Sequence, residues 1–129
     1  MRRGALAALF LLAACAREST PSPQPDPLIE TRWIMADGGG DAPTLEFSEN
    51  RAGGYAGCNR WFAQVSSNYP ALGFTGIGAT RRICSAEVMA IEGAFFAALR
   101  ATEIARVDSN VLTLQDTTGA DLARFNRVR

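Results

Sequence analysis

Three cysteines are the residues of this chain whose chemistry is most open to interpretation. They stand at positions 15, 58 and 84. A cysteine can carry a lipid, pair with a second cysteine, or act as a nucleophile if a neighbouring group favours its thiolate form. The surroundings of each cysteine decide between these roles.

Cys15 ends a segment with the pattern of a secretory signal. Arg2 and Arg3 precede an uncharged apolar stretch from Gly4 to Ala13, which is much shorter than the roughly 20 residues of a transmembrane helix. Leu12-Ala13-Ala14-Cys15 resembles the bacterial lipobox. We therefore expect residues 1–14 to be a lipoprotein signal peptide and Cys15 to be lipidated, rather than an ordinary cleaved signal or a buried helix.

The residues after Cys15 predict a spacer and a location. Residues 15–27 contain four prolines, which favour an extended backbone, so we expect a lipid-anchored tether rather than a proline-rich signalling ligand. Lipidation implies a membrane as the first partner and the cell envelope as the location. Ala16 stands where an Asp would favour inner-membrane retention, which points to the outer membrane, with the domain facing the periplasm.

Composition narrows the function classes. The chain has no His and no Lys, and the residues after the signal carry 11 Arg against 13 acidic residues, a net charge of −2. This balance argues against nucleic-acid binding. Without His, triads that use His as the base are excluded, and we expect no metal site, no cofactor and no enzymatic activity. We also expect a monomer.

Cys58 and Cys84 form an even pair in an oxidising compartment. A disulfide between them closes a loop of 27 residues, from 58 through 84, and contributes about 3.5 kcal/mol in the chain-entropy model. Two buried thiols or one reactive thiol are the alternatives. Gly57-Cys58-Asn59 could place a nucleophile on a tight turn, but no base accompanies it, so a structural turn is favoured.

Other polar motifs give weaker hypotheses. Residues 37–41, Asp-Gly-Gly-Gly-Asp, lack the ligand spacing of an EF-hand, so a solvated loop is preferred to a calcium site. Arg81 and Arg82 precede a predicted helix and could bind an anion, pair with Glu87 or face water. The residues predicted to form a binding surface are Asn59, Arg60, Trp61, Arg81 and Arg82. Trp61 and Phe62 must point to opposite faces of a strand.

The remaining pattern predicts an α+β domain over residues 28–129. Apolar residues alternate in eight short segments, whereas Val88, Ile91, Phe95 and Leu99 follow a helical period after Ser85, a suitable N-cap. The expected order is five strands, one helix and three strands. Short connections favour an antiparallel sheet that curls into a cracked barrel, with the helix over one mouth or the open side.

Several of these segments together resemble the META domain of the heat-shock protein HslJ type. They are Trp33-Ile34-Met35, Leu45-x-Phe47, Gly57-Cys58-Asn59-Arg60, Thr80-Arg81-Arg82-Ile83-Cys84, Glu92 with Phe95 and Leu99, and Leu112-x-Leu114. Ala63 and Arg82 depart from the family pattern, in which Gly and Met are frequent. The resemblance implies a small β-rich fold with one helix, and a link to envelope stress, without an established catalytic mechanism.

Two functions follow from the sequence. The leading hypothesis is a non-enzymatic envelope lipoprotein module that binds a protein partner or a small ligand. The alternative is a lipoprotein inhibitor of a lysozyme-type or other secreted enzyme, although the Ser-Gly-rich loop of such inhibitors is not found.

Overall fold

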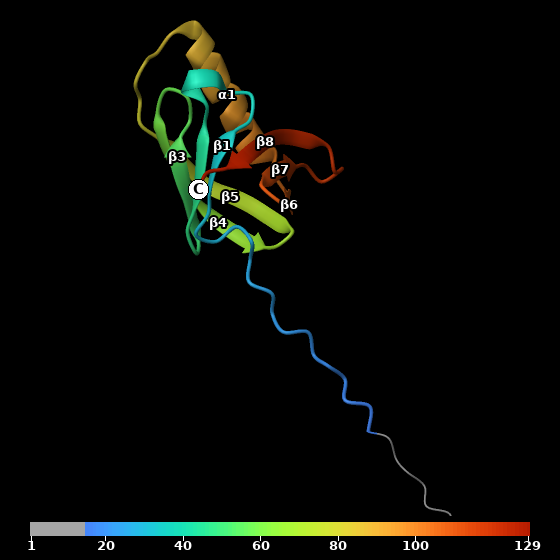
Figure 1. Ribbon diagram of the computed structural model, residues 1–129. Helices are drawn as coiled ribbons and strands as arrows, with labels where there is room; N and C mark the ends of the chain where they lie inside the picture. Colours follow the sequence, from blue (N-terminus) through green and yellow to red (C-terminus); the bar gives the residue numbers. More distant parts are fainter. Residues whose placement is uncertain (1–14) are drawn as a thin grey trace, which may run out of the picture.

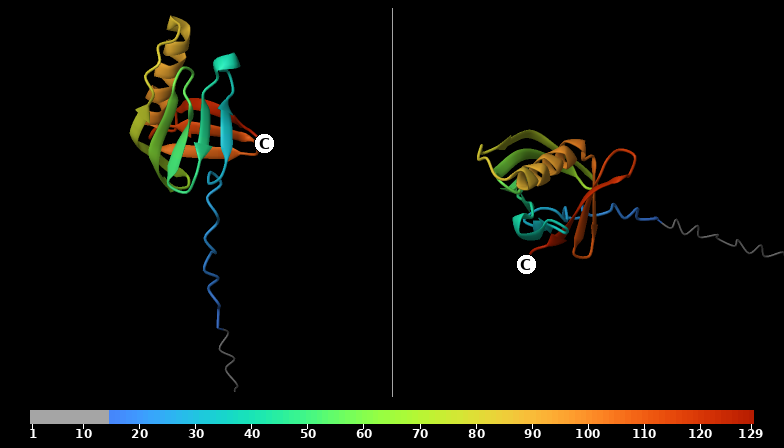
Figure 2. Two further views of the ribbon diagram at one scale, coloured as in Figure 1. Left: turned by 90° about the vertical axis from the view of Figure 1, so that its left-hand side faces the viewer. Right: turned by 90° about the horizontal axis from the view of Figure 1, so that it is seen from above.

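Eight antiparallel strands form a closed barrel with one long helix across its upper end (Figures 1 and 2). The computed structural model describes residues 15–129, so the predicted signal peptide, residues 1–14, lies outside the described residues. The elements, in chain order, are β1 Arg32–Met35, the 3-10 turn η1 Gly39–Asp41, β2 Thr44–Phe47, β3 Arg51–Tyr55, β4 Arg60–Asn68, β5 Ala71–Ala79, α1 Ala86–Ala101, β6 Ile104–Asp108, β7 Val111–Gln115 and β8 Asp121–Arg127.

The barrel closes in chain order, with β1 paired to β8. The pairing of β5 with β6 is the shortest in the barrel, with Ala71 and Ile104 as the one pair of register partners. The helix is inserted in the chain between these two strands, and it packs against β5, β7 and β8. The prediction of an antiparallel barrel with one covering helix is therefore confirmed.

The helix begins and faces the barrel as its sequence predicts. Ser85 is the N-cap, and its hydroxyl oxygen accepts a hydrogen bond from the Val88 amide at 3.4 Å. Such a bond satisfies one of the amides that a helix start leaves without an intrahelical partner. Phe95 and Leu99 are almost completely buried, as the helical period requires.

Phe95 joins the helix to the barrel core. Its ring makes edge contacts with Trp61 of β4, at a centroid distance of 5.4 Å, and with Phe125 of β8, at 6.3 Å. Edge-to-face aromatic pairs add to the stabilisation from buried apolar area. One helical side chain thus packs against strands from both halves of the barrel.

The lower end of the barrel is closed by the residues that follow the tether. Leu28 is 1% exposed and belongs to the core cluster. The Asp26 carboxylate accepts a hydrogen bond from the Leu28 amide at 2.8 Å and another from the Ser67 hydroxyl. Figure 2 shows the tether leaving the domain at the end opposite to the start of the helix. Within residues 15–129, the structure has no helix that combines the length and the apolarity needed to cross a membrane.

We predict that Phe95→Ala lowers the free energy of unfolding by about 3–5 kcal/mol, because it removes the ring between Trp61 and Phe125 and leaves a cavity. Equilibrium denaturation in urea measures the loss. Phe62→Ala is the matched control, since the Phe62 side chain is 62% exposed and its removal should cost less than about 1 kcal/mol. Equal losses in the two variants would contradict this assignment of the core.

Candidate functional site

A disulfide ties the turn after β3 to the loop before the helix. Cys58 and Cys84 are joined, with their Cα atoms 5.9 Å apart, so the expected pairing is present. Neither cysteine therefore has a free thiol, which leaves Cys58 without the nucleophile that a tight turn could have presented. Cys15 is exposed and forms no disulfide within residues 15–129, and its lipidation stays a prediction.

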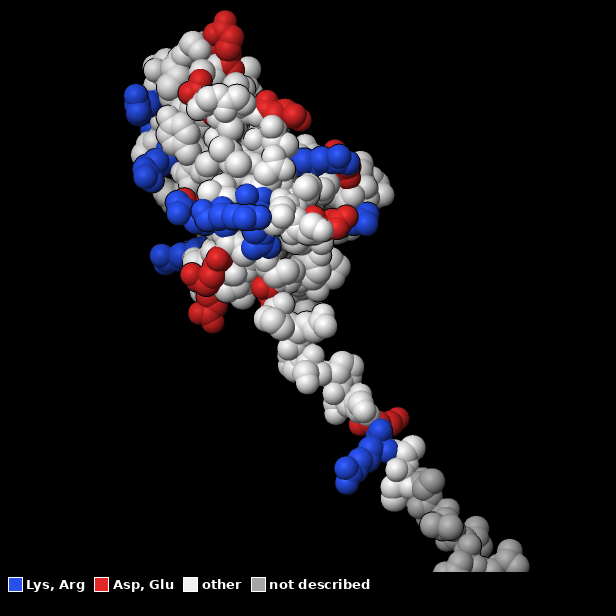
Figure 3. Space-filling view, in the orientation of Figure 1, with Lys and Arg blue, Asp and Glu red and all other residues white. Residues whose placement is uncertain are grey.

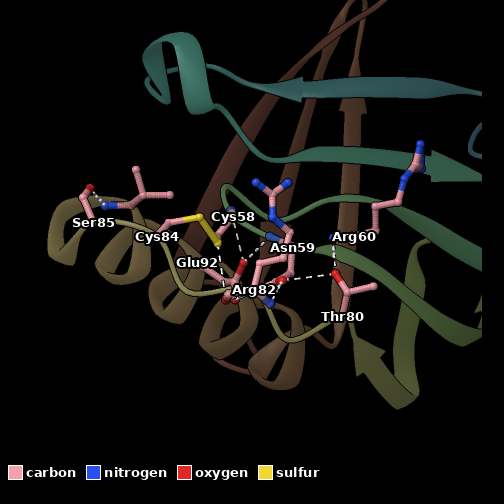
Figure 4. The surroundings of a disulfide bond; sticks show 9 residues. Cys58, Asn59, Arg60, Thr80, Arg82, Cys84, Ser85 and Glu92 are labelled. Carbon is pink, nitrogen blue, oxygen red and sulfur yellow. Dashed lines mark hydrogen bonds between the residues drawn. A yellow bond between two sulfur atoms is a disulfide. The ribbon is translucent and has the colours of Figure 1, made fainter.

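A buried carboxylate of the helix accepts hydrogen bonds from the same turn (Figure 4). Glu92 is 6% exposed, and its Oε2 accepts hydrogen bonds from the amides of Cys58 at 3.2 Å and Asn59 at 2.8 Å. Its Oε1 accepts a third bond from the Asn59 side-chain amide at 2.9 Å. Three donors compensate for the loss of water around this carboxylate. Glu92 thus fastens the helix to the barrel turn.

Asn59 carries the network from the helix to the loop. Its side-chain amide also donates to the Arg82 carbonyl at 3.2 Å, while its Oδ1 accepts from the Arg82 amide at 2.6 Å. Oδ1 also accepts a bond from the Thr80 hydroxyl at 3.1 Å. Both backbone polar groups of Arg82 are thus held by one buried side chain, which fixes the path of the loop.

Gly57 allows the chain to make this turn. Its φ of +111° lies in a region that residues with a Cβ rarely adopt. The turn is completed by a hydrogen bond from the Ala56 amide to the Asn59 carbonyl at 2.8 Å. Gly57, Cys58 and Asn59 therefore act as a structural unit: the first permits the turn, the second staples it, and the third binds the loop.

The structure divides the predicted binding surface into buried and exposed residues. Asn59 and Trp61 are each 3% exposed, so their assignment to a surface was wrong. Asn59 is used by the network, and Trp61 lies in the core, where its indole N–H donates to the Thr44 carbonyl at 3.0 Å. Arg60, Arg81 and Arg82 are exposed, as predicted.

Two exposed apolar residues lie on the same segments as the exposed arginines. Ile83 is 93% exposed, the highest value among the large hydrophobic side chains of the described chain, and Phe62 follows at 62%. Phe62 lies over Gly78 on the outer face, because a Cβ on Gly78 would come within 2.5 Å of its ring. Sequence reasoning missed Ile83, since an apolar residue beside a cysteine is usually assigned to the core.

The arginines next to Ile83 are not neutralised by the neighbouring helix. In residues 15–129 the ion pairs are Arg32 with Glu46 and Arg124 with Asp121, so the alternative in which Arg81 or Arg82 pairs with Glu87 is not the one that the structure adopts. The pKa of Glu87 lies below its ordinary value because its own backbone amide and the Ser85 hydroxyl hydrogen-bond to the carboxylate. The Glu87 carboxylate therefore interacts with the N-terminus of its own helix.

The glycine-rich loop of residues 37–41 contains a short 3-10 turn. Residues 39–41 of this loop make the 3-10 turn η1, and Gly38 packs closely against Ala42. Within the part of the chain that the structure describes, no three acidic or cysteine side chains gather in the manner of a metal site.

Comparison with known proteins decides the family. The model of the META domain matches residues 27–129, which is most of the chain. The protein belongs to the META domain family. The match includes the Gly57-Cys58-Asn59 turn, the loop that ends at Cys84, and Glu92 of the helix, so the residues that form the network all lie in the META domain.

Solved structures support the same fold. An NMR structure of a protein from Burkholderia xenovorans has a TM-score of 0.66 and 23% sequence identity, with 87% of this chain and 97% of that chain covered. A second protein solved by NMR has a TM-score of 0.60 and 18% identity, covering 77% and 90% of the two chains. At these identities the likeness shows the fold alone. The comparison with curated proteins finds no match.

We predict that Glu92→Gln lowers the free energy of unfolding by about 2–4 kcal/mol, because one of the two acceptor oxygens becomes an NH₂ group facing donors that then have no partner. Chemical denaturation monitored by Trp fluorescence measures the loss. Glu49→Gln, in the exposed turn before β3, is the control and should leave the stability within about 0.5 kcal/mol. A neutral Glu92→Gln would show that the network contributes little.

Proposed function

We propose that this META domain protein is a non-enzymatic envelope lipoprotein that binds a partner protein through the loop of residues 80–84. The observation that carries the proposal is Ile83, an aliphatic side chain that is 93% exposed on a backbone held by the disulfide and by Asn59. Exposing a large apolar side chain costs solvation free energy. Docking into a partner offsets this cost.

The rigidity of the loop favours recognition over a merely solvated turn. Arg82 is fixed at its amide and its carbonyl, and Cys84 is fixed by its sulfur, so Ile83 stands between two anchored residues. A side chain presented on a preorganised backbone loses less conformational entropy when it binds. The buried Glu92 and Asn59 thus hold the backbone that presents the Ile83 side chain.

The position of the loop suits a tethered domain. The tether leaves at the lower end of the barrel, while residues 80–84 lead to the start of the helix at the other end (Figure 2). A lipid at Cys15 would therefore keep the loop directed away from the anchoring surface. The extended proline-rich spacer, at about 3.1 Å per residue, would add roughly 35 Å of reach.

Lipidation is tested by metabolic labelling. Cells that express the full chain with a fatty-acid probe should yield a labelled protein in the membrane fraction, because acyl chains on Cys15 hold it there. The Cys15→Ser variant should be unlabelled. Cys58→Ser with Cys84→Ser should still be labelled, which separates acylation from general thiol reactivity. An unlabelled, soluble wild-type chain would refute the lipoprotein part of the proposal.

Binding is tested by capture from envelope extracts with the purified chain of residues 15–129 carrying Cys15→Ser. Ile83→Ser should reduce recovery of a specific partner by about tenfold, the loss expected for a central contact residue. Val111→Ser is the control, since Val111 is 38% exposed at the start of β7. Proteins retained equally by both variants do not bind the loop, and an unchanged profile would refute this role of Ile83.

A further inference from the structure

The arginines near Ile83 indicate which kind of partner surface this loop would bind. Arg81 and Arg82 precede Ile83, and Arg60 lies beside them because it pairs with Thr80: the Arg60 amide donates to the Thr80 hydroxyl at 3.1 Å, and the Thr80 amide donates to the Arg60 carbonyl at 3.0 Å. Arg60, Arg81, Arg82, Ile83 and Phe62 are here called the arginine-apolar surface.

The residues of this surface come from the ends of two paired strands and from the loop that follows the second strand. Phe62 is the register partner of Gly78, and its ring lies over that glycine, two residues before Thr80. Arg60 is two residues from Phe62 on the same strand face. The two most exposed large hydrophobic side chains of the described residues, Ile83 and Phe62, therefore lie on the same two connected segments as the three arginines, residues 60–62 and 80–83.

The three arginines of this surface form no ion pair within residues 15–129. Arg32 and Arg124, in contrast, each have an acidic partner at 3.0 Å or less. The carboxylate of Glu92 is occupied by three N–H donors of the turn, and that of Glu87 by its own helix end. Figure 4 shows the side chains of Arg60 and Arg82 reaching away from the Glu92 network.

The protein as a whole is not basic. Figure 3 shows arginines across the middle and on one side of the domain, with acidic side chains above and below them and, in places, directly beside them. The protein after the signal has a net charge of −2, so a local group of unpaired arginines is not a by-product of a basic chain. Local excess charge steers partners of the opposite sign.

We propose that the arginine-apolar surface docks a protein whose own surface has an apolar pocket rimmed by Asp and Glu side chains. Ile83 enters the pocket, Arg81 and Arg82 bind carboxylates at its rim, and Phe62 and Arg60 extend the contact along the barrel wall. Arginine binds carboxylates through paired N–H donors, and aromatic residues with arginine are enriched at interface centres. The inference rests on the proposed binding function and names its partner chemistry.

The absence of lysine from the chain permits a specific test. A carbodiimide joins an amine to a carboxylate that contacts it, so Arg82→Lys in the chain carrying Cys15→Ser introduces one reactive side-chain amine at the proposed surface. In envelope extract, this variant should be cross-linked through position 82 to an Asp or Glu of a partner protein, as identified by mass spectrometry. Adding Ile83→Ser should reduce the cross-linked product about tenfold.

Arg106→Lys is the matched control, because Arg106 is exposed on β6, outside the arginine-apolar surface. It should give no comparable product. Raising the salt concentration from about 0.05 to about 0.5 M should weaken capture of the partner, because surface charges are screened at shorter distances. Arg81→Glu with Arg82→Glu should reduce capture at least as much as Ile83→Ser does.

The outcomes separate this inference from the proposed function. If Ile83→Ser abolishes capture but salt, charge reversal and the cross-link at position 82 have no effect, the partner binds the loop without carboxylates and only the acidic-partner inference fails. If no protein depends on Ile83, both fail. Sedimentation with vesicles of phosphatidylglycerol and phosphatidylethanolamine tests the other class: binding that is lost in Arg81→Glu with Arg82→Glu, without a protein cross-link, would identify a membrane surface and overturn the inference.

Discussion

The carboxylate of Glu92 is the interaction on which the upper end of the molecule depends. It lies on the helix, it is buried, and it accepts hydrogen bonds from the Cys58 amide, the Asn59 amide and the Asn59 side chain. A buried charge is tolerated only where fixed dipoles replace water. Because these donors come from a turn between β3 and β4, one helical residue determines how the helix, the turn and the following loop are assembled.

The disulfide and the hydrogen bonds of this region have complementary effects. The Cys58–Cys84 bond connects residues 26 apart in sequence and restricts the unfolded chain. Asn59, in contrast, fixes the direction of the folded loop, since it bonds both the amide and the carbonyl of Arg82. A covalent link alone would allow the loop to rotate about its sulfur atoms. The combination gives Ile83 a fixed position although its side chain is exposed.

The barrel and the site use different parts of the helix. Phe95 and Leu99 point into the core and pack against the strands, whereas Glu92, one turn earlier, bonds the turn. Both sets lie on one helical face because residues three and four apart are neighbours. The same face that closes the barrel therefore also positions the loop, so the stability of the fold and the geometry of the proposed binding surface are linked.

Strand alternation, the period of Val88 to Leu99 and an even cysteine count are local or arithmetic signals, so the sequence predicted the elements and favoured the Cys58–Cys84 disulfide over two buried thiols or one reactive thiol. Short motifs along the domain carried the family resemblance. The burial of particular polar residues became apparent only in the folded chain, because it depends on contacts between residues far apart in sequence. Glu92 and Asn59 belong to the motifs of the family resemblance, but nothing in the sequence indicated that Glu92 is buried or that the two residues bind each other across the Gly57 turn. Ile83 is the converse case: its exposure follows from the loop path, which depends on contacts between residues more than twenty positions apart.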